Sequence, residues 1–415
     1  ESLGLVDEKH FQSILNTGMY KYCPDTMNVT QAQHEALTSI IHTIDSGETF
    51  PHIGQGFLAR PILIEGDAGT GKTVVATTLF YYLKTHPKYK SLKIGLVYSN
   101  PAMRNVIQQV FAHTPGLRKT DVIAPIDVTK HHYDIIICDE AQRLRQAKNI
   151  GRYIVHFKKG NERLHLDNSH DELDWLLLNA GRLILFYDPK QIVCPSDISQ
   201  TKFDGRLKDR KRGIRPVELK EQMRIHAGSQ YVPYIYDILF QRNNISKKFV
   251  NYDFKLFSSF QDMWNALEEK EAAVKLCRFC TGYGWPWVSK EDSKKPDIQL
   301  EGREIWWNRQ TDGWLQNPEA KLEMGSIYSL AGLDINYAAV IIGPDLIYDI
   351  KDQKIKVNRQ NYFDNKVKQG VTDEELTAFL LKTYAVLMTR GILGTYVYTC
   401  DQNLFRYLQR FIPTA

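Results

Sequence analysis

The sequence predicts an α/β protein whose parallel sheets are divided between two lobes. Short apolar runs typical of buried strands alternate along the chain with helical patterns, an order that favours parallel sheets. These runs form two sets, separated by a basic, glycine-containing stretch near residues 201–215. With 415 residues, the chain is also too long for one compact core. We therefore expect an N-terminal segment over 1–26, a first lobe over 27–200 and a second lobe over 201–415.

The strand candidates follow from apolar runs bounded by polar or turn-forming residues. In the first lobe they are residues 61–64, 93–98, 133–138 and 182–187, and in the second 217–219, 254–257, 272–276, 338–342 and 395–399. Residues 281–322 hold most of the chain's tryptophans and resemble an irregular insertion more than a domain.

The composition suits a cytoplasmic protein with no membrane segment. No apolar stretch approaches the roughly 20 residues that cross a bilayer, and the six scattered cysteines suit reduced thiols. Cys277 and Cys280 have the spacing of a zinc pair, but no second pair lies nearby, so a structural role competes with zinc binding. Since the chain begins at Glu1, we expect it to be part of a longer protein.

A net charge of +5 permits a polyanionic partner without requiring one. The strongest local concentration of positive charge lies in the stretch between the two lobes. Two interpretations compete for it: contact with a phosphate backbone, or a solvated linker. The residues are Arg206, Lys208, Arg210, Lys211, Arg212 and Arg215.

The strongest motif is a complete phosphate-binding loop, G-x-x-x-x-G-K-[ST], which follows the strand at 61–64 and precedes an amphipathic helix. Its backbone N–H groups can surround phosphate, Lys72 can reach the β and γ oxygens, and Thr73 can offer a hydroxyl to Mg²⁺. We expect this loop to bind ATP. Its residues are Gly66, Asp67, Ala68, Gly69, Thr70, Gly71, Lys72 and Thr73.

Two adjacent carboxylates, Asp139 and Glu140, end the strand at 133–138. Ligands of open α/β sheets sit at the carboxyl ends of strands. Asp139 can hold Mg²⁺, and Glu140 can polarise the water that attacks the γ-phosphate. Alone, such a pair is often only a helix cap; together with the loop upstream, it favours hydrolysis.

At this point the chain resembles a superfamily 1 helicase, and the later elements resemble the Schlafen group 3-like DNA/RNA helicase domain family. The likeness extends from about residue 28 to the C-terminus. It implies two RecA-like lobes, ATP and Mg²⁺ in the cleft, and single-stranded DNA or RNA as partner. Gln33 is similar to the family's adenine-reading glutamine, with Gln31 as the competing candidate.

The same resemblance assigns further roles. Asn100, Pro101 and Arg104 match an element that borders the nucleic-acid track. Gln191, in Asp-Pro-Lys-Gln, resembles a sensor of the γ-phosphate. Arg224 and Arg390 resemble second-lobe arginines that would neutralise charge on the transferred phosphoryl group. When the lobes close, these arginines would complete the catalytic set that includes Lys72 and Glu140.

One element departs from the family. Tyr328 and Ala331 stand where the family has histidine and glutamine, while Gly332 and Asp334 retain the glycine and acid expected to contact nucleotide. Tyr328 occupies the nucleic-acid side of this element, so unwinding is the activity most affected.

Two functions therefore compete. The first is a Mg²⁺-dependent, nucleic-acid-stimulated ATPase that translocates on or remodels DNA or RNA. The alternative is a non-unwinding, nucleotide-gated sensor that controls a fused or partner nuclease. The resemblance implies antiviral defence for such a module.

Overall fold

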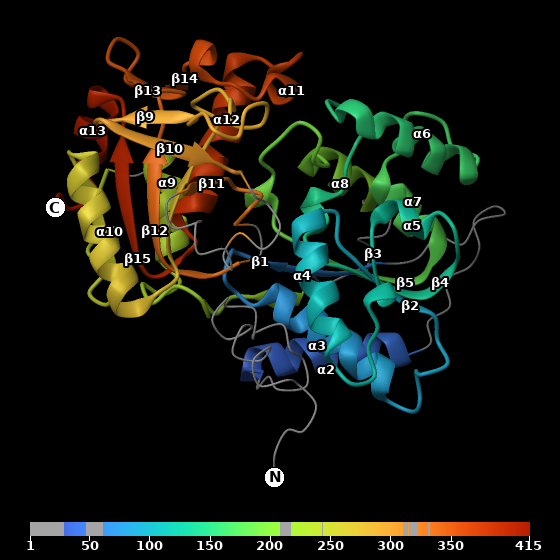
Figure 1. Ribbon diagram of the computed structural model, residues 1–415. Helices are drawn as coiled ribbons and strands as arrows, with labels where there is room; N and C mark the ends of the chain where they lie inside the picture. The colour runs from blue at the N-terminus through green and yellow to red at the C-terminus, as the bar shows by residue number, and fades with distance from the viewer. Residues whose placement is uncertain are drawn as a thin grey trace. The chain divides into compact units, whose positions relative to one another are not determined.

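The computed structural model describes residues 29–46, 61–207, 217–242, 244–309, 314, 323–330 and 333–415 (Figure 1). The chain divides into two compact units, the first ending at Glu221 and the second running from Gln222 to Ala415. Each unit is built around its own sheet.

The first unit contains a sheet whose paired strands all run parallel, in the order β3-β2-β4-β5-β1-β6. The four strands predicted in this region are confirmed. Because the strands are parallel, their carboxyl ends meet at one edge, where β1, β2, β4 and β5 each lead into a polar loop. The strands are β1 (Pro61–Gly66), β2 (Ile94–Val97), β3 (Val122–Ile123), β4 (Tyr133–Cys138), β5 (Ala180–Tyr187) and β6 (Val217–Leu219).

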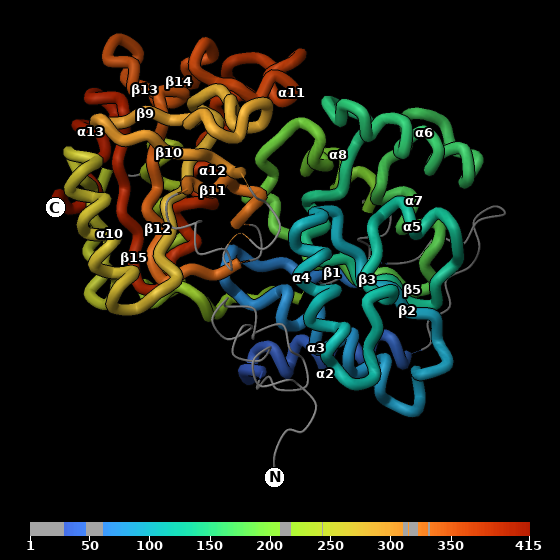
Figure 2. The backbone as a smooth tube through the Cα atoms, in the orientation of Figure 1, coloured from blue at the N-terminus to red at the C-terminus, as the bar shows by residue number. Residues whose placement is uncertain are grey.

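Helices cover both faces of this sheet (Figures 1 and 2). One face packs against α5 (Pro125–Val128), α6 (Ile154–Arg163), α7 (Glu172–Asn179) and α8 (Gln200–Leu207), whose apolar side chains share a core with alternate residues of the strands. The other face packs against α3 (Lys72–Thr85). Helices α2 (Gln31–Asp45) and α4 (Pro101–Ala112) lie next to α3. Phe80 of α3 stacks on Phe111 of α4.

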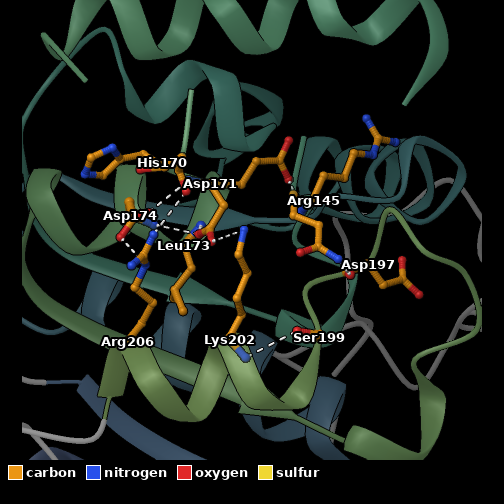
Figure 3. Close-up of polar contacts among 12 residues, drawn as sticks. Arg145, His170, Asp171, Leu173, Asp174, Asp197, Ser199, Lys202 and Arg206 are labelled. Carbon is orange, nitrogen blue, oxygen red and sulfur yellow. Dashed lines mark hydrogen bonds and ion pairs between the residues drawn. The ribbon is translucent and has the colours of Figure 1, made fainter. Parts of the chain in front are cut away.

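Ion pairs hold α8 against α7 (Figure 3). Arg206 Nε lies 2.9 Å from Asp174 Oδ1, and Lys202 points toward the buried Asp171. Asp171 also caps α7, accepting the Leu173 N–H at 3.1 Å. Arg206, predicted as part of a phosphate-contacting or solvated segment, is thus a structural ion-pair partner. The rest of that segment lies outside the described residues.

The second unit contains a larger sheet, in the order β7-β15-β12-β8-β11-β10-β9. All its pairings are parallel except that of β9 with β10. A separate hairpin pairs β13 with β14. The strands are β7 (Asp253–Phe257), β8 (Cys277–Thr281), β9 (Ile298–Leu300), β10 (Arg303–Trp307), β11 (Glu323–Gly325), β12 (Ile335–Ile342), β13 (Leu346–Asp349), β14 (Lys354–Val357) and β15 (Gly391–Thr399).

Helix α10 covers one face of the second sheet, where Phe260 and Trp264 join its apolar core. Helix α12 contacts β8, β12 and β15 and also packs against α9. The helices of this unit are α9 (Tyr231–Leu239), α10 (Phe260–Val274), α11 (Asn365–Lys368), α12 (Asp373–Met388) and α13 (Gln402–Leu408).

Three sequence-based expectations differ from the structure. Strand β6 belongs to the first sheet, because Ile64 of β1 pairs with Val217, so the first unit extends past the expected boundary at residue 200 to Glu221. The strand predicted at 272–276 is wrong: α10 continues to Val274 and β8 begins at Cys277. Within the expected irregular insertion, β9 and β10 extend the second sheet.

The tryptophans and cysteines of the second unit are largely core residues. Trp307 and Trp314 are buried, and Trp285 and Trp287 pack against the core around α10. Cys277 and Cys280 are both buried on β8. Their spacing of three residues on a strand directs them to opposite faces of the sheet, and burial raises the pKa of the Cys277 thiol to about 12. Within the described ranges, no helix has the length and apolar character of a membrane span.

Candidate nucleotide-binding and hydrolysis site

The loop after β1 forms a tight cradle at the start of α3. Gly69 and Gly71 adopt φ of 86° and 85°, a left-handed conformation that glycine adopts without strain. A Cβ atom added to Gly66 would lie 2.6 Å from Thr70 Oγ1 and 2.9 Å from the Leu219 carbonyl oxygen. The loop therefore requires glycine at these positions, and it presents the N-terminus of α3, which favours anions.

Lys72 is buried beneath this cradle, with 5% of its surface exposed. Its Nζ donates to the carbonyl oxygens of Gly66 at 2.6 Å and Asp67 at 3.0 Å. The same ammonium lies 3.8 Å from Asp188 Oδ2. Lys72 thus ties the loop after β1 to the loop after β5.

Asp139, at the end of β4, is fully buried. Among the described residues, its Oδ2 has no hydrogen-bond partner. Burial and the neighbouring Glu140 charge raise its pKa to about 6, while Thr73 and Lys72 act in the opposite direction. A buried carboxylate oxygen without a partner, next to the Thr73 hydroxyl, is a donor set that fits Mg²⁺, since that ion prefers oxygen ligands.

Glu140 has a left-handed backbone, with φ of 53°. This conformation is uncommon for a residue with a side chain and is concentrated at functional sites. Its Oε2 accepts a hydrogen bond from Gln142 Nε2 at 2.5 Å. The carboxylate is therefore held in one orientation by the 3-10 turn Ala141–Arg143 that follows it.

The loop after β5 is joined to the same network. Gln191 is buried, and its Nε2 donates to Asp188 Oδ2 at 2.8 Å. The Asp188 backbone N–H donates to Gln142 Oε1 at 3.1 Å. Burial raises the pKa of Asp188, against the effect of the Lys72 charge and the Gln191 amide. One chain of contacts thus runs from Glu140 through Gln142 and Asp188 to Lys72.

Lys190, which the sequence analysis did not single out, lies against the phosphate-binding loop. Its Nζ contacts both carboxylate oxygens of Asp67, at 2.7 and 2.9 Å. In the sequence, the indication that Lys190 belongs to the site was its position between Asp188 and Gln191. The sequence analysis also did not identify Gln142 as a site residue. Its role appears only in the fold, where the side chain is 0% exposed and its amide bridges two loops that are distant in the chain.

The structure distinguishes the two glutamine candidates of α2. Gln33 is buried, and its Nε2 is the group that a Cβ added to Gly71 would strike. Its Oε1 also accepts the Thr30 N–H at 3.0 Å in a capping box. Gln31 is exposed and donates to Glu35. Gln33 is therefore the glutamine that lies at the phosphate-binding loop.

The loop after β2 carries the predicted nucleic-acid residues. Asn100 caps α4 through the Ala102 N–H at 2.9 Å, and Pro101 is the first helical residue. Arg104 donates from Nη1 to the Tyr98 carbonyl oxygen at 3.0 Å, and burial lowers its pKa. All three residues follow β2 at the same edge of the sheet as the phosphate-binding loop.

In the second unit, two residues predicted for separate tasks contact each other. Arg224 Nε lies 2.5 Å from Asp334 Oδ1, and both side chains are mostly buried. Arg390 is buried at the turn between α12 and β15. Tyr328 is half-buried after β11, where its N–H donates to Ser326 Oγ. Gly332 lies outside the described residues.

Comparisons with known proteins agree with this arrangement. The profile of the family described as Schlafen group 3, DNA/RNA helicase domain, matches residues 60–401. An uncharacterized protein of Saccharomyces cerevisiae, YPL245W, is 26% identical over 393 residues, covering 84% of this chain and 83% of that protein.

Solved structures with detectable similarity include two helicases. The arterivirus nonstructural protein 10 helicase has a TM-score of 0.36 at 12% identity, covering 85% of this chain and 62% of its own. The Pif1 helicase from Candida albicans has a TM-score of 0.28 at 10% identity, with 59% and 55% covered.

The family match extends from the start of β1 past the end of β15 and so includes both units. It contains the phosphate-binding loop, the carboxylates after β4 and the Asp188–Gln191 loop. The predicted α/β fold, with parallel sheets divided between two units, is confirmed by the structure. The chain belongs to the Schlafen group 3 DNA/RNA helicase domain family.

Proposed function

We propose that this protein is a Mg²⁺-dependent ATPase of the superfamily 1 helicase type, stimulated by single-stranded DNA or RNA. The observation that carries the proposal is the network at the carboxyl edge of the first sheet. Lys72 and Gln191 both contact Asp188, and Gln142 links Asp188 to Glu140. A solely structural loop cluster would not need a buried lysine and two buried carboxylates, Asp139 and Asp188, whose pKa values burial raises.

In this proposal the phosphate-binding loop wraps the triphosphate, and Lys72 exchanges its carbonyl partners for β and γ oxygens. Thr73 and Asp139 hold Mg²⁺, which when bound neutralises charge on the phosphates. Glu140, oriented by Gln142, accepts a proton from the attacking water. Gln191, held by its hydrogen bond to Asp188, contacts the γ-phosphate and so senses whether it is present. Gln33 reads the adenine.

Arg224 and Arg390 complete the site by stabilising charge on the transferred phosphoryl group when the second unit closes on the first. Asp334 currently neutralises Arg224, so nucleotide would compete with this carboxylate for the guanidinium. Gly332 and Asp334 would then contact the nucleotide from the same element.

Nucleic acid would bind along Asn100, Pro101 and Arg104, with Tyr328 contributing from the second unit. Membership of a DNA/RNA helicase domain family supports a nucleic-acid partner. Hydrolysis would drive closure of the units and translocation on, or remodelling of, the strand.

Tyr328 favours a second candidate function. It replaces the histidine of the family's fifth element, and its backbone is fixed by Ser326. If that element transmits no signal between nucleic acid and ATP, the protein is a nucleotide-gated sensor that controls a nuclease domain or partner protein without unwinding.

The test is ATP turnover by the wild type and by Glu140→Gln, with and without single-stranded DNA or RNA. We expect Glu140→Gln to bind ATP with unchanged affinity and to lose turnover by about 10²-fold or more. Robust turnover by this variant would overturn the role of Glu140. Strong, salt-sensitive stimulation by one polymer supports the motor, whereas turnover indifferent to every polymer supports the sensor.

A further inference from the structure

A line of basic side chains follows one exposed side of α6. The members are Arg152, in the 3-10 turn Gly151–Tyr153 that leads into the helix, and His156, Lys159 and Arg163 within it. All four are exposed. At about 100° per residue, these positions fall within an arc of about 60° around the helix. We call them the α6 stripe.

Another side of the helix is built into the core. Phe157, Gly160 and Asn161 are buried, and Asn161 accepts the Trp175 indole N–H at 2.6 Å. A Cβ on Gly160 would strike the Trp175 ring. Because this packing fixes the rotation of α6 about its axis, the stripe is held facing solvent.

The positive charge of the stripe is not neutralised locally. Across the parts of the chain that the structure describes, Arg152 and Lys159 form no ion pair. The acid of this helix, Glu162, falls about 60° to one side of the stripe. Arg163 donates to the Thr129 hydroxyl at 3.3 Å, a neutral partner that leaves its charge in place.

The segment that leads into the stripe starts at the same edge of the first sheet as the predicted nucleic-acid element. Arg145 stacks over the Tyr153 ring at 4.3 Å, and Glu172 fixes both, accepting the Tyr153 hydroxyl and the Arg145 N–H at 2.8 Å each (Figure 3 shows Arg145). Arg145 and Tyr153 belong to the segment after β4, and Arg104 to the segment after β2; because β4 pairs in parallel with β2, both segments start at the same edge of the sheet. The stripe therefore leads away from the loop after β2 along α6.

The dimensions suit a single strand of nucleic acid. From Arg152 to Arg163 the helix rises about 16 Å, at about 1.5 Å per residue. One strand of a nucleic acid carries a charge about every 3.4 Å of axis in helical geometry, so this length faces about four or five phosphates. The one ring among its four members, the imidazole of His156, packs beside the Tyr153 ring at 5.8 Å between centroids, and the other three carry only cationic groups, which suits backbone contact without base recognition.

We propose that the α6 stripe binds the phosphate backbone of single-stranded nucleic acid, independently of sequence, and continues the path that starts at Asn100 and Arg104. The proposal rests on the nucleic-acid partner of the proposed function. It adds a surface on the first unit that none of the family-like motifs includes.

The test compares two adjacent lysines of the same helix. Lys159 belongs to the stripe, whereas Lys158 is exposed about 100° away from it. Binding of a labelled oligo(dT) and a labelled oligo(U) to the purified chain is measured by fluorescence anisotropy without nucleotide, across a salt series. The variants are Lys159→Gln, the matched control Lys158→Gln, and the double variant Arg152→Gln/Lys159→Gln.

We expect Lys159→Gln to reduce the slope of log K against log[salt] by about 0.7 and the double variant by about 1.4, with Lys158→Gln unchanged. Equal effects of the two lysine variants would overturn the proposal, since that result reflects net charge alone. Loss of binding to poly-Glu, with oligonucleotide binding unchanged in Lys159→Gln, would also overturn it and indicate an acidic protein partner. ATP turnover of the wild type without polymer decides the proposed function separately.

Discussion

The side-chain amide of Gln142 donates a hydrogen bond to the carboxylate of Glu140 at 2.5 Å. Through its other atom, Oε1, the same amide accepts the Asp188 N–H. One fully buried side chain therefore fixes the proposed general base and the loop that carries Gln191. The orientation of the base depends on a residue that would not itself touch ATP.

We predict that Gln142→Ala lowers ATP turnover roughly 10- to 100-fold while ATP affinity changes little, because Glu140 loses its orientation but Lys72 and the loop after β1 are intact. The measurement is turnover together with binding of a fluorescent ATP analogue. Gln146→Ala is the matched control, since Gln146 also donates two hydrogen bonds, to the Pro195 and Asp197 carbonyl oxygens, outside this network. An equal loss of turnover in both variants would contradict the positioning role.

Asp139 should make the fold less stable at neutral pH. Its pKa in the folded protein is about 6, above the ordinary 3.8. The folded state thus binds the proton more tightly, and stability is lost as pH rises from about 4 through 6. Asp139→Asn should remove that loss and raise the free energy of unfolding at pH 7.5 by about 1–3 kcal/mol, although activity is abolished.

Urea unfolding of wild type and Asp139→Asn at pH 4 and pH 7.5 measures this difference. Asp134→Asn, an exposed change on the same strand, is the control. Asp171, whose pKa burial likewise raises to about 6, titrates in both proteins and cancels in the comparison. A variant that is no more stable than the wild type at pH 7.5 would argue against a destabilising buried charge at Asp139.

The Asp67–Lys190 ion pair should tune nucleotide affinity. Without Lys190, the Asp67 carboxylate would repel the triphosphate, so Lys190→Met should weaken ATP binding, and Asp67→Asn should strengthen it, each by about threefold because both groups are partly exposed. Titration calorimetry at two salt concentrations measures this. The double variant should bind like Asp67→Asn, because loss of Lys190 then exposes no carboxylate; a threefold weakening by Lys190→Met in the Asp67→Asn background as well would show that the pair is not coupled.

Gln33 should set the preference for adenine. A glutamine amide can pair with both N6 and N7 of adenine. In Gln33→Glu, the carboxylate keeps the capping acceptor for the Thr30 N–H but removes the amide donors, so the preference for ATP over GTP should fall about tenfold. Gln31→Glu introduces the same charge at an exposed position and should retain the preference. Equal losses in the two variants would indicate a charge effect.

The features that the sequence predicted correctly share a local cause. Strand β1 and the glycines after it are adjacent in the chain, so an apolar run and a short motif were enough to place Lys72 at a helix N-terminus. Strand β6 was assigned to the wrong sheet because three residues, Val217–Leu219, carry no information about which distant strand they pair with.

Other errors and omissions have physical reasons as well. The run at 272–276 is apolar enough for a strand, but Ser259 caps α10 and the helix continues until Lys275 adopts φ of 60°. The role of Gln142 could not be read from the sequence, because it depends on the directions of two loops that meet only in the folded sheet. The roles given to Arg224 and Arg390 stay predictions.

The place of β6 has a practical consequence for anyone who expresses the first unit alone. A fragment that ends at residue 200 would leave β1, directly before the phosphate-binding loop, as the edge strand of the sheet, paired with β5 on one side only. Such an edge offers open N–H and C=O groups to other chains and invites aggregation. It would also remove the Leu219 carbonyl that lies close to Gly66. A fragment extended to Glu221 keeps β6 paired with β1. It is the shortest fragment of the first unit that we expect to stay soluble and to bind nucleotide.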